Sequence, residues 1–310
     1  MQVEAELAEV SPKKDMLLTI GVFDGVHLGH KYLLSKLKEQ ADKRRLLSGV
    51  VTFHQHPRAV LGNRPELPYL TSLDEKVALI KNEGIDTVIT LSFSKELSRL
   101  SAREFVALLK KHLRMQGLVL GADFMLGQNR EGDIARLSKL GQEMGFSVEA
   151  VPQATAGEQV VSSTVIRDAL AKGSIKKVTG MFGRPFSLHG NVMRGAGRGK
   201  TLGFPTANIE VDPQQLLPPD GVYATIACLG CKTYLSLTNV GKNPTFGANR
   251  RTVEVYLLDF EGNIYGHELR IDFIERLRGE RKFSSVEELK KQMAADVEQG
   301  RAALRTITAK

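Results

Sequence analysis

The sequence predicts two domains of different fold class: an α/β domain built on a parallel sheet, then a small antiparallel β-barrel with a C-terminal helix. Three observations support this prediction. The chain has 310 residues, a length that suits two domains better than one. Apolar runs alternate with helical patterns in the first half, and helical periodicity is lost near residues 183–192. We therefore expect domains at residues 1–183 and 184–310.

The first half contains five runs rich in apolar and β-branched residues, which predict strands at 17–23, 49–53, 86–91, 117–121 and 147–151. Helical patterns lie between them at 30–45, 72–84 and 101–117. Strands that alternate with helices at this spacing form right-handed crossovers. We therefore expect a Rossmann-like parallel sheet, whose ligands bind at the carboxyl ends of its strands.

The second half contains short strand-like segments separated by Gly, Pro and Asn turns. The predicted strands are 186–193, 221–228, 233–240, 252–260 and 268–277. Strands this short and closely spaced are typical of a small antiparallel barrel. A Ser-x-x-Glu capping box at 284–289 predicts the start of the final helix.

Charge and cysteine content narrow the classes of partner and compartment. The net charge is +8, and this excess is shared equally between residues 1–183 and 184–310. A nucleic-acid binder usually concentrates its basic residues on one face or arm, so we expect no nucleic-acid partner. The acidic N-terminus is unlike a secretory signal, and no apolar run approaches the ~20 residues of a membrane span. We expect a cytoplasmic protein with no membrane partner.

The only cysteines are Cys228 and Cys231, in the stretch C-L-G-C. One C-x-x-C pair lacks the second pair of ligands that a structural zinc site needs. The spacing instead predicts two strand residues on either side of a Leu-Gly hairpin turn. So few cysteines also favour a reducing compartment.

The stretch GVFDGVHLGH, residues 21–30, follows the first predicted strand and leads into a helix. Such a turn leaves backbone N–H groups free at the positive end of the helix dipole, which is a general seat for phosphate. His27 and His30 could donate hydrogen bonds to phosphate oxygens and stabilise charge during transfer. Metal ligation, acid-base catalysis and an ordinary polar helix start are the alternatives for this pair.

A second anion-binding element is predicted in VSSTVIRDAL, residues 161–170. Ser163 and Thr164 would stand at a helix start, with Arg167 one turn further on. Hydroxyl groups, free N–H groups and a guanidinium suit an anion. A simple helix cap with a surface arginine is the alternative interpretation.

In the second half, RGAGRGKTLGFPTANI at residues 194–209 is the most specific stretch. No helix follows its glycines, so it is not a dinucleotide-binding fingerprint. Thr206 and Asn208 lie two apart on an extended segment and offer neutral oxygens that suit Mg²⁺ on ATP phosphates. Lys200 and the loop glycines would lie over those phosphates. A glycine-rich hairpin and a polar edge strand are the alternative.

Together, the motifs at 21–30 and 161–170 resemble the adenylyltransferase half of the bifunctional bacterial riboflavin kinase/FAD synthetases. The resemblance implies a nucleotidyltransferase domain in which FMN phosphate attacks the α-phosphorus of ATP and pyrophosphate leaves. The ATP-binding residues that it implies are Gly21, Phe23, Asp24, His27, Gly29, His30, Ser163, Thr164 and Arg167. His27, His30 and Arg167 would be the catalytic ones among them. The flavin-binding residues that it implies are His56, Asp123 and Phe124.

The G-x-x-x-G-x-P-T-A-N motif resembles the hallmark of the same family's riboflavin kinase module. PPDGVYA, NVGKNPTFG, IYG and LRGERKF follow in the family's order. The resemblance makes Glu254 the general base on the ribityl hydroxyl, although TVEVYLL alone would also suit an outward-facing strand residue. The implied ATP-binding residues are Gly197, Gly199, Lys200, Thr206 and Asn208, of which Thr206 and Asn208 also hold the metal. The implied flavin-binding residues are Arg278, Glu280 and Phe283.

The family resemblance predicts an enzyme that makes FMN from riboflavin and ATP and then FAD from FMN, with Mg²⁺ in both steps. Gln55 stands where the family has Pro, and Leu126 where it has an aromatic residue. A working kinase with a weak adenylyltransferase domain is therefore one alternative, and a flavin-binding regulatory protein is another. We expect a monomer or a weak homo-oligomer.

Overall fold

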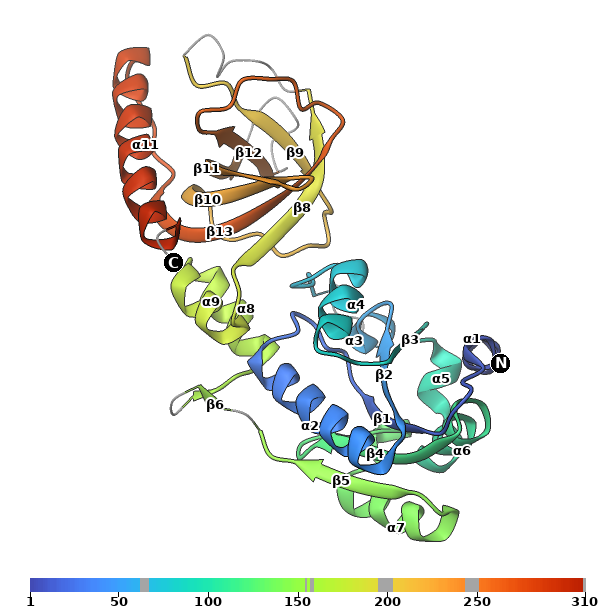
Figure 1. The fold of residues 1–310 in the computed structure, drawn as a ribbon. Coiled ribbons are helices and arrows are strands. Elements are labelled where there is room, and N and C mark those ends of the chain that lie inside the picture. The colour runs from blue at the N-terminus through green and yellow to red at the C-terminus, as the bar shows by residue number, and fades with distance from the viewer. Residues whose placement is uncertain (62–66, 154, 157–158, 195–202, 243–250, 309–310) are drawn as a thin grey trace. The chain divides into compact units, whose positions relative to one another are not determined.

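A computed structural model of the chain describes residues 1–61, 67–153, 155–156, 159–194, 203–242 and 251–308 (Figure 1). The chain divides into two compact units, Met1–Ser163 and Thr164–Lys310. Each unit has its own sheet and its own buried side chains. The domain boundary that we expect at residue 183/184 stays a prediction. The compact units divide after Ser163, so α9 and nearly all of α8 belong to the second unit.

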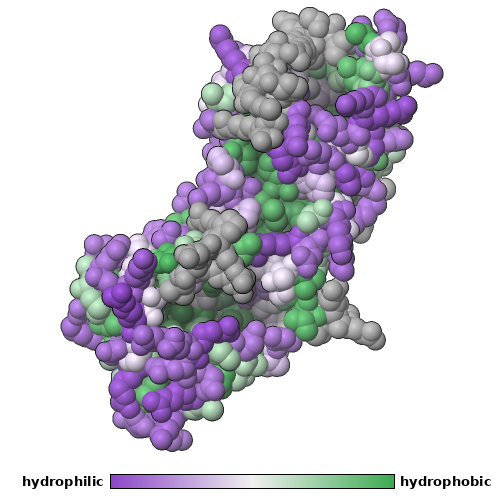
Figure 2. Space-filling model, turned by 180° about the vertical axis from the view of Figure 1, so that it is seen from behind, coloured by the Kyte–Doolittle hydropathy of each residue, from purple (hydrophilic) through white to green (hydrophobic). Residues whose placement is uncertain are grey.

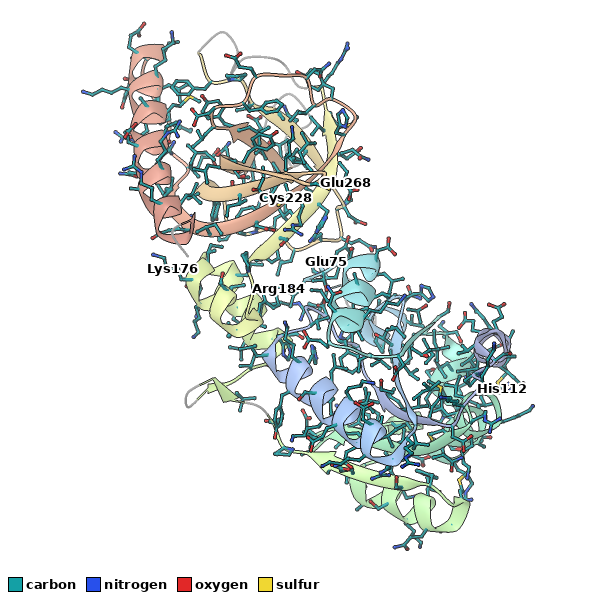
Figure 3. The ribbon with its side chains drawn as sticks, in the orientation of Figure 1. Glu75, His112, Lys176, Arg184, Cys228 and Glu268 are labelled. Carbon is teal, nitrogen blue, oxygen red and sulfur yellow. The ribbon has the colours of Figure 1, made fainter. Side chains whose placement is uncertain are left out.

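Hydrophilic side chains cover most of the face of each unit that is visible in Figure 2. Lys176, labelled in Figure 3, has a side chain that is 74% exposed, and its Nζ lies 2.7 Å from Glu275 Oε1. None of the helices in the described residues combines the length and the apolar character needed to cross a membrane.

The first unit contains five parallel strands in the order β3-β2-β1-β4-β5, which confirms the predicted fold class. Their bounds are β1 Met16–Ile20, β2 Leu47–Phe53, β3 Thr87–Leu91, β4 Met115–Gly121 and β5 Ser147–Val151. Strand order reverses between β1 and β4, so the loops after these two strands leave opposite ways and open a crevice at their carboxyl ends. A two-stranded ribbon of β6 (Thr155–Ala156) and β7 (Gln159–Val160) follows.

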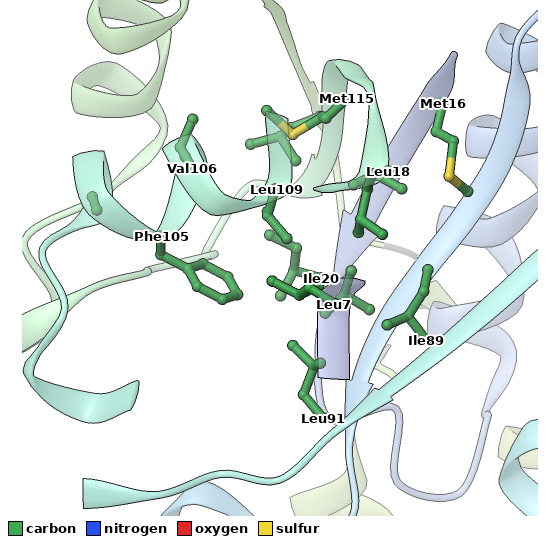
Figure 4. Packing of buried hydrophobic residues seen from close by; sticks show 14 of the residues in the cluster. Leu7, Met16, Leu18, Ile20, Ile89, Leu91, Phe105, Val106, Leu109 and Met115 are labelled. Atoms are coloured by element: carbon green, nitrogen blue, oxygen red, sulfur yellow. The ribbon is translucent and has the colours of Figure 1, made fainter. Parts of the chain in front are cut away.

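Helices cover both faces of this sheet. Their bounds are α1 Gln2–Val10, α2 Leu28–Arg44, α3 Pro57–Leu61, α4 Leu73–Asn82, α5 Lys95–Arg99, α6 Ala102–Leu113 and α7 Ile134–Met144, with a short 3-10 turn, η1, at Gln128–Arg130. On one face, α2 and α4 bury apolar side chains against the sheet. On the other, α1, α6 and α7 form a larger core, in which Leu7, Leu109 and Ile20 pack together (Figure 4). Because helices cover both faces of the sheet, its strands are continuous runs of apolar residues.

The polar N-terminus forms a helix that the sequence analysis did not predict. In α1, Val3 and Leu7 lie four residues apart on one face and are 2% and 0% exposed. The helix packs on α6 and β3. The carboxylate of Glu6 also accepts a hydrogen bond from the backbone N–H of Ser92, at 2.9 Å. Two apolar residues within one turn are enough to dock this short helix because the larger core is already in place.

The second unit contains a closed barrel in the order β10-β11-β12-β9-β8-β13. The bounds are β8 Phe186–Met193, β9 Ala207–Val211, β10 Gly221–Leu229, β11 Lys232–Lys242, β12 Arg251–Leu257 and β13 Glu268–Gly279. Five of these strands coincide with predicted ones. The sixth, β9, is the polar segment after the glycine-rich loop, and it closes the barrel by pairing with β8 and β12.

Three helices complete the second unit: α8 (Ser163–Ala171), whose first residue belongs to the first unit, α9 (Ile175–Phe182) and α11 (Val286–Thr308). The backbone N–H of Glu288 donates to Ser285 Oγ at 3.1 Å, which confirms the serine cap of the predicted capping box at the start of α11. The Glu288 carboxylate accepts from the backbone N–H of Ser284, at 3.0 Å, rather than from that of the cap residue Ser285. This helix packs on β10, β11 and β13. A Cβ atom at Gly300 would lie only 2.4 Å from the Leu237 side chain, so a glycine allows the close approach of α11 to β11.

The two cysteines lie at the hairpin between β10 and β11, and both are free thiols. Figure 3 labels Cys228 on the barrel. Leu229 pairs with Lys232, so the two turn residues are Gly230 and Cys231. The predicted Leu-Gly turn is therefore wrong by one residue. Gly230 has a φ of 56°, a left-handed conformation that places the glycine at the first turn position.

Candidate active sites

The first candidate site lies at the carboxyl ends of β1 and β4, where the order of the parallel strands reverses. The loop at residues 21–27 follows β1 and leads into α2. Asp123, which is exposed, and Phe124 follow β4, and Phe124 packs partly against the larger core. The structure therefore brings the predicted ATP and flavin segments of this domain to one edge of the sheet, where doubly wound folds bind ligands.

The loop backbone has an unusual conformation. Phe23, Gly25 and Val26 have φ angles of 51°, 86° and 37°. A left-handed conformation costs a β-branched residue such as Val26 about 1 kcal/mol or more, so the surrounding contacts must hold it in place. A Cβ atom at Gly29 would lie 3.0 Å from both the Val161 carbonyl and the His27 ring. The glycine thus permits close packing at the helix start.

His27 and His30 lie against each other at the N-terminus of α2. His27 is the N-cap residue, and its Nδ1 accepts a hydrogen bond from the His30 backbone N–H at 3.3 Å. The two rings are stacked with centroids 3.7 Å apart, and the Phe23 ring meets His30 edge-on at 5.1 Å. Among the described residues, the buried Nδ1 of His30 has no hydrogen-bond partner.

Burial keeps both imidazoles neutral. It lowers the pKa of His27 to about 4. Burial is the main cause that holds the pKa of His30 well below its usual value, and the electrostatic interactions with the neighbouring His27 and with Lys76 lower it further. Because His27 Nδ1 accepts a hydrogen bond, its proton is assigned to Nε2. Each neutral ring offers one N–H donor, so the pair can donate to phosphate oxygens without itself taking up a proton.

Two predicted residues hold the loop from within the first unit. Asp24 is buried, and its Oδ1 accepts hydrogen bonds from the backbone N–H groups of Leu70 and Thr71 at 2.9 and 3.3 Å. Ser163, the first residue of α8, donates its hydroxyl to the Asp24 carbonyl at 2.9 Å. Thr164 and Arg167 follow on α8 within the second unit, and their contribution to this site stays a prediction.

A pocket of about 360 Å³ lies between the segments that follow β2, β3 and β4. Its lining includes Phe53, Phe93, Phe105 and Leu126. The rings of Phe53 and Phe93 meet edge-to-face at 5.4 Å. Leu126, which stands where the family has an aromatic residue, thus lies in a pocket that already contains three phenylalanines. Gln55 Nε2 donates to the Phe93 carbonyl at 3.3 Å.

Lys76, a buried lysine beside this site, is not among the residues predicted from the sequence. Its ammonium donates hydrogen bonds to the carbonyls of Phe53 and Val22 at 2.8 and 3.2 Å. Lys76 is four residues from buried Ile80 on α4, so a charged residue on the apolar stripe of the helix was a signal in the sequence. Buried lysines are rare unless they have partners.

The second candidate site lies on neighbouring strands of the barrel. Asn208 on β9 and Asn239 on β11 both pair directly with Glu254 on β12. Directly opposite side chains share a face and have Cβ atoms ~5 Å apart. The strand neighbours of Asn208 and Glu254 are buried, so these two residues lie on the outer face of the barrel. Thr206 comes two residues before Asn208, just before β9 begins.

The donor set at β9 and β12 fits a magnesium ion. The side-chain oxygen of Asn208 is buried and has no hydrogen-bond partner among the described residues. Carboxamide, hydroxyl and phosphate oxygens are the hard ligands that Mg²⁺ takes in nucleotide sites. The predicted loop residues Gly197, Gly199 and Lys200 lie outside the described residues, as does the segment NPTFG at 243–247.

The predicted flavin residues of the second unit lie at the end of β13 and just after it. The Glu280 carboxylate lies over Gly241, where a Cβ atom would be 3.2 Å from Oε1. Arg278 is held by Asp296 of α11, whose carboxylate accepts three hydrogen bonds from the guanidinium at 2.8 to 3.1 Å. The Arg278 guanidinium also lies 5.7 Å from the centre of the Phe283 ring. The N–H groups of Arg278 thus donate largely to acceptors within the protein.

Two family models match the chain, each over one of these sites. The model described as FAD synthetase matches residues 9–165. The model described as riboflavin kinase matches residues 182–304. Together they span both candidate sites, from the loop after β1 to the residues after β13.

Similar proteins match along nearly the whole chain. A bifunctional riboflavin kinase/FMN adenylyltransferase of Escherichia coli (strain K12) is 38% identical over 288 residues, which is 92% of each chain. Proteins of the same description from Listeria monocytogenes and Bacillus subtilis are 36% and 34% identical. They cover 92% and 90% of this chain, and 91% and 90% of their own lengths.

A crystal structure from Streptococcus pneumoniae, described as a macrolide-efflux protein, is also similar. It is 30% identical in sequence, with a TM-score of 0.89 over 97% of each chain. Its description differs in function from those of the sequence relatives. The similarity in fold nevertheless extends over both units.

Proposed function

The chain belongs to the family of bifunctional riboflavin kinases/FMN adenylyltransferases, and we propose that its two sites divide the two reactions between them. The protein phosphorylates riboflavin to FMN and adenylylates FMN to FAD, and ATP is the co-substrate of both steps. The barrel site carries the first reaction and the site at the carboxyl ends of β1 and β4 carries the second. The neutral histidine pair at the start of α2 is the observation that supports the second assignment most strongly.

In adenylyl transfer, the phosphate of FMN attacks the α-phosphorus of ATP and pyrophosphate leaves. The loop at residues 21–27 and the N-terminus of α2 bind the triphosphate, because the positive end of the helix dipole favours an anion there. His27 and His30 donate to oxygens whose negative charge grows in the transition state. Thr164 and Arg167 add a hydroxyl and a guanidinium. The reaction needs no covalent bond to the protein, so alignment and charge stabilisation provide the catalysis.

The pocket lined by Phe53, Phe93 and Leu126 holds the flavin ring of FMN. Edge-to-face and stacked aromatic contacts suit a flat, largely apolar ring. Phe93 supplies the aromatic surface that Leu126 lacks, which favours an active adenylyltransferase over a weak one. Asp123, Phe124 and His56 remain proposed flavin contacts at the same edge of the sheet.

In riboflavin phosphorylation, Glu254 accepts the proton of the ribityl hydroxyl while that oxygen attacks the γ-phosphorus. Thr206 and Asn208 would hold Mg²⁺, which neutralises charge on the ATP phosphates when it is bound. The pairing of Asn208 with Glu254 puts the proposed metal ligand beside the proposed base. Arg278, Glu280 and Phe283 contact the flavin, and Arg278 also holds that segment against α11 through Asp296.

The remaining expectations are proposals of the same kind. The even spread of the net charge of +8 over the two halves supports a protein without a nucleic-acid partner. We place it in the cytoplasm, as a monomer or a weak homo-oligomer, and draw the boundary between the two domains at residue 183/184.

Two substitutions separate the activities. The full chain is incubated with riboflavin or FMN and Mg-ATP, and the flavins are separated by chromatography. Glu254→Gln should stop FMN formation but still make FAD from added FMN. His30→Gln should form FMN normally but make FAD about a hundredfold more slowly, as expected for the loss of one transition-state donor. His112→Gln and Glu261→Gln are the matched controls and should leave both rates unchanged.

The same assay distinguishes the alternatives. Wild-type protein that accumulates FMN without FAD would favour a kinase with a weak adenylyltransferase domain. Flavin binding with neither product would favour a regulatory protein. Normal FMN formation by Glu254→Gln would refute the assignment of the base.

A further inference from the structure

Lys76 on α4 is a buried cation that the proposed mechanism does not use. It is 6% exposed, and its Nζ donates to the carbonyl oxygens of Phe53 and Val22. Burying an ammonium costs several kcal/mol, and an apolar side chain of the same length would pack on α4 without that cost. A lysine at this position therefore calls for an explanation beyond packing.

The two carbonyls that Lys76 binds belong to functionally different segments. Val22 belongs to the phosphate-binding loop after β1, residues 21–27, and Phe53 is the last residue of β2 and lines the proposed flavin pocket. Thr52 Oγ1 also donates to the Val22 carbonyl, at 3.1 Å. One ammonium thus links the segment that binds ATP to the segment that binds the flavin.

The chain just before Lys76 holds the same loop. Thr71 Oγ1 accepts a hydrogen bond from the Gly25 backbone N–H at 3.1 Å. The backbone N–H groups of Leu70 and Thr71 bind the Asp24 carboxylate. The loop contains Val26 at a φ of 37°, a strained conformation that persists only where surrounding contacts over-determine it. Residues 70–76 therefore form a brace for the phosphate-binding loop, and Lys76 contributes a buried positive charge to it.

The charge of Lys76 acts on the same site. Burial lowers the pKa of Lys76 to about 8, against the opposing attraction of Asp24. At neutral pH the ammonium is thus mostly protonated, and its charge helps to keep His30 neutral. The group that holds the loop also favours the protonation state in which His30 has a donor but no charge.

We propose that Lys76 is a positioning residue for adenylyl transfer, which aligns the ATP-binding loop with the flavin pocket through the Val22 and Phe53 carbonyls. The inference rests on the adenylyltransferase function proposed for the first unit. A small displacement between two bound substrates lowers the rate of transfer more than it weakens the binding of either, because alignment matters most in the transition state.

The test compares Lys76→Met, which keeps the length and apolar volume, with Lys76→Arg, which keeps a charge and several donors. Lys81→Met is the matched control, since Lys81 is exposed on the same helix. FAD formation from FMN gives kcat and the KM for ATP and FMN, and riboflavin phosphorylation by the same chain is the internal reference. We expect Lys76→Met to lower kcat for FAD about ten- to a hundredfold while each KM changes less than about threefold. Kinase activity and Lys81→Met should match the wild type.

The arginine variant separates positioning from space filling. If Lys76 only fills space, Lys76→Met should have a higher kcat for FAD formation than Lys76→Arg, whose side chain is bulkier. If Lys76 positions the loop through hydrogen bonds, Lys76→Arg should have the higher kcat. A Lys76→Met protein with wild-type kcat for FAD, or with a higher kcat than Lys76→Arg, overturns the inference. Wild-type protein that makes FMN but no FAD overturns the proposed function, and the inference with it.

Discussion

The pair of Arg278 and Asp296 offers the sharpest test of what attaches α11 to the barrel. Three hydrogen bonds of 2.8 to 3.1 Å join the guanidinium to the carboxylate, and the two side chains are 21% and 4% exposed. Asp296→Asn removes the negative charge that compensates the positive charge of Arg278 in a largely buried site. Breaking a buried pair in this way costs about 3–5 kcal/mol, and because Arg278 is partly exposed we expect a loss of about 3 kcal/mol.

Urea unfolding of the full chain, followed by far-UV circular dichroism, measures this loss. With an m-value of about 2 kcal/mol/M for a unit of this size, about 3 kcal/mol lowers the midpoint of the second unit's transition by ~1.5 M. Asp259→Asn is the matched control, because Asp259 forms two hydrogen bonds to Arg301 of the same helix but has a 72% exposed side chain. Its midpoint should shift by less than about 0.3 M.

The double variant Asp296→Leu/Arg278→Met completes the test. Replacing both charges by apolar side chains should recover most of the stability, since no buried charge is left unpaired. Equal midpoints for Asp296→Asn and Asp259→Asn would refute the reasoning. A double variant as unstable as Asp296→Asn would mean that packing rather than charge compensation joins α11 to the barrel.

Two further predictions concern the histidine pair and the extent of the second unit. Burial lowers the pKa of His27 to about 4, so between this value and its usual 6.5 the unfolded chain binds a proton that the folded chain does not. The first unit should lose about 2 kcal/mol between pH 7 and pH 5 through this group, and urea midpoints should show a smaller loss for His27→Gln. Residues 164–310 expressed alone should phosphorylate riboflavin. Residues 184–310 should have a free energy of unfolding lower than that of residues 164–310 by at least about 4 kcal/mol. The shorter fragment lacks α9, which contacts β8 and β13 and buries four apolar side chains. Equal unfolding midpoints for the two fragments would contradict this.

Local patterns in the sequence predict much of the fold and both candidate sites. Alternating apolar runs and helical stripes predict the parallel sheet, because strands covered on both faces and helices covered on one have different periodicities. The Gly-rich turn before α2 predicts a phosphate seat, because glycine and a helix start have direct backbone consequences. Asn208 and Glu254 lie 46 positions apart in the chain, and only the motif resemblance connected them before the strand register did.

What the sequence does not reveal depends on contacts between distant segments. The polar segment of β9 forms a strand because β8 and β12 offer it hydrogen-bonding edges, although its own pattern is ambiguous. From the sequence alone, Leu126 suggests weaker flavin binding, because it replaces an aromatic residue of the family. In the folded protein it lies in a pocket with phenylalanines from three other segments.

The sequence by itself determined the order of the domains, the helix starts and the residue types at each site, because these follow from near neighbours in the chain. Only the tertiary structure decided which charges are buried and what holds them. Lys76 looks like an ordinary helix lysine until the ends of β1 and β2 present two carbonyls to its ammonium. The bond between Arg278 and Asp296 likewise forms only because α11 packs on the barrel. Desolvation and long-range pairing set the chemistry of both residues, and neither can be read from adjacent positions.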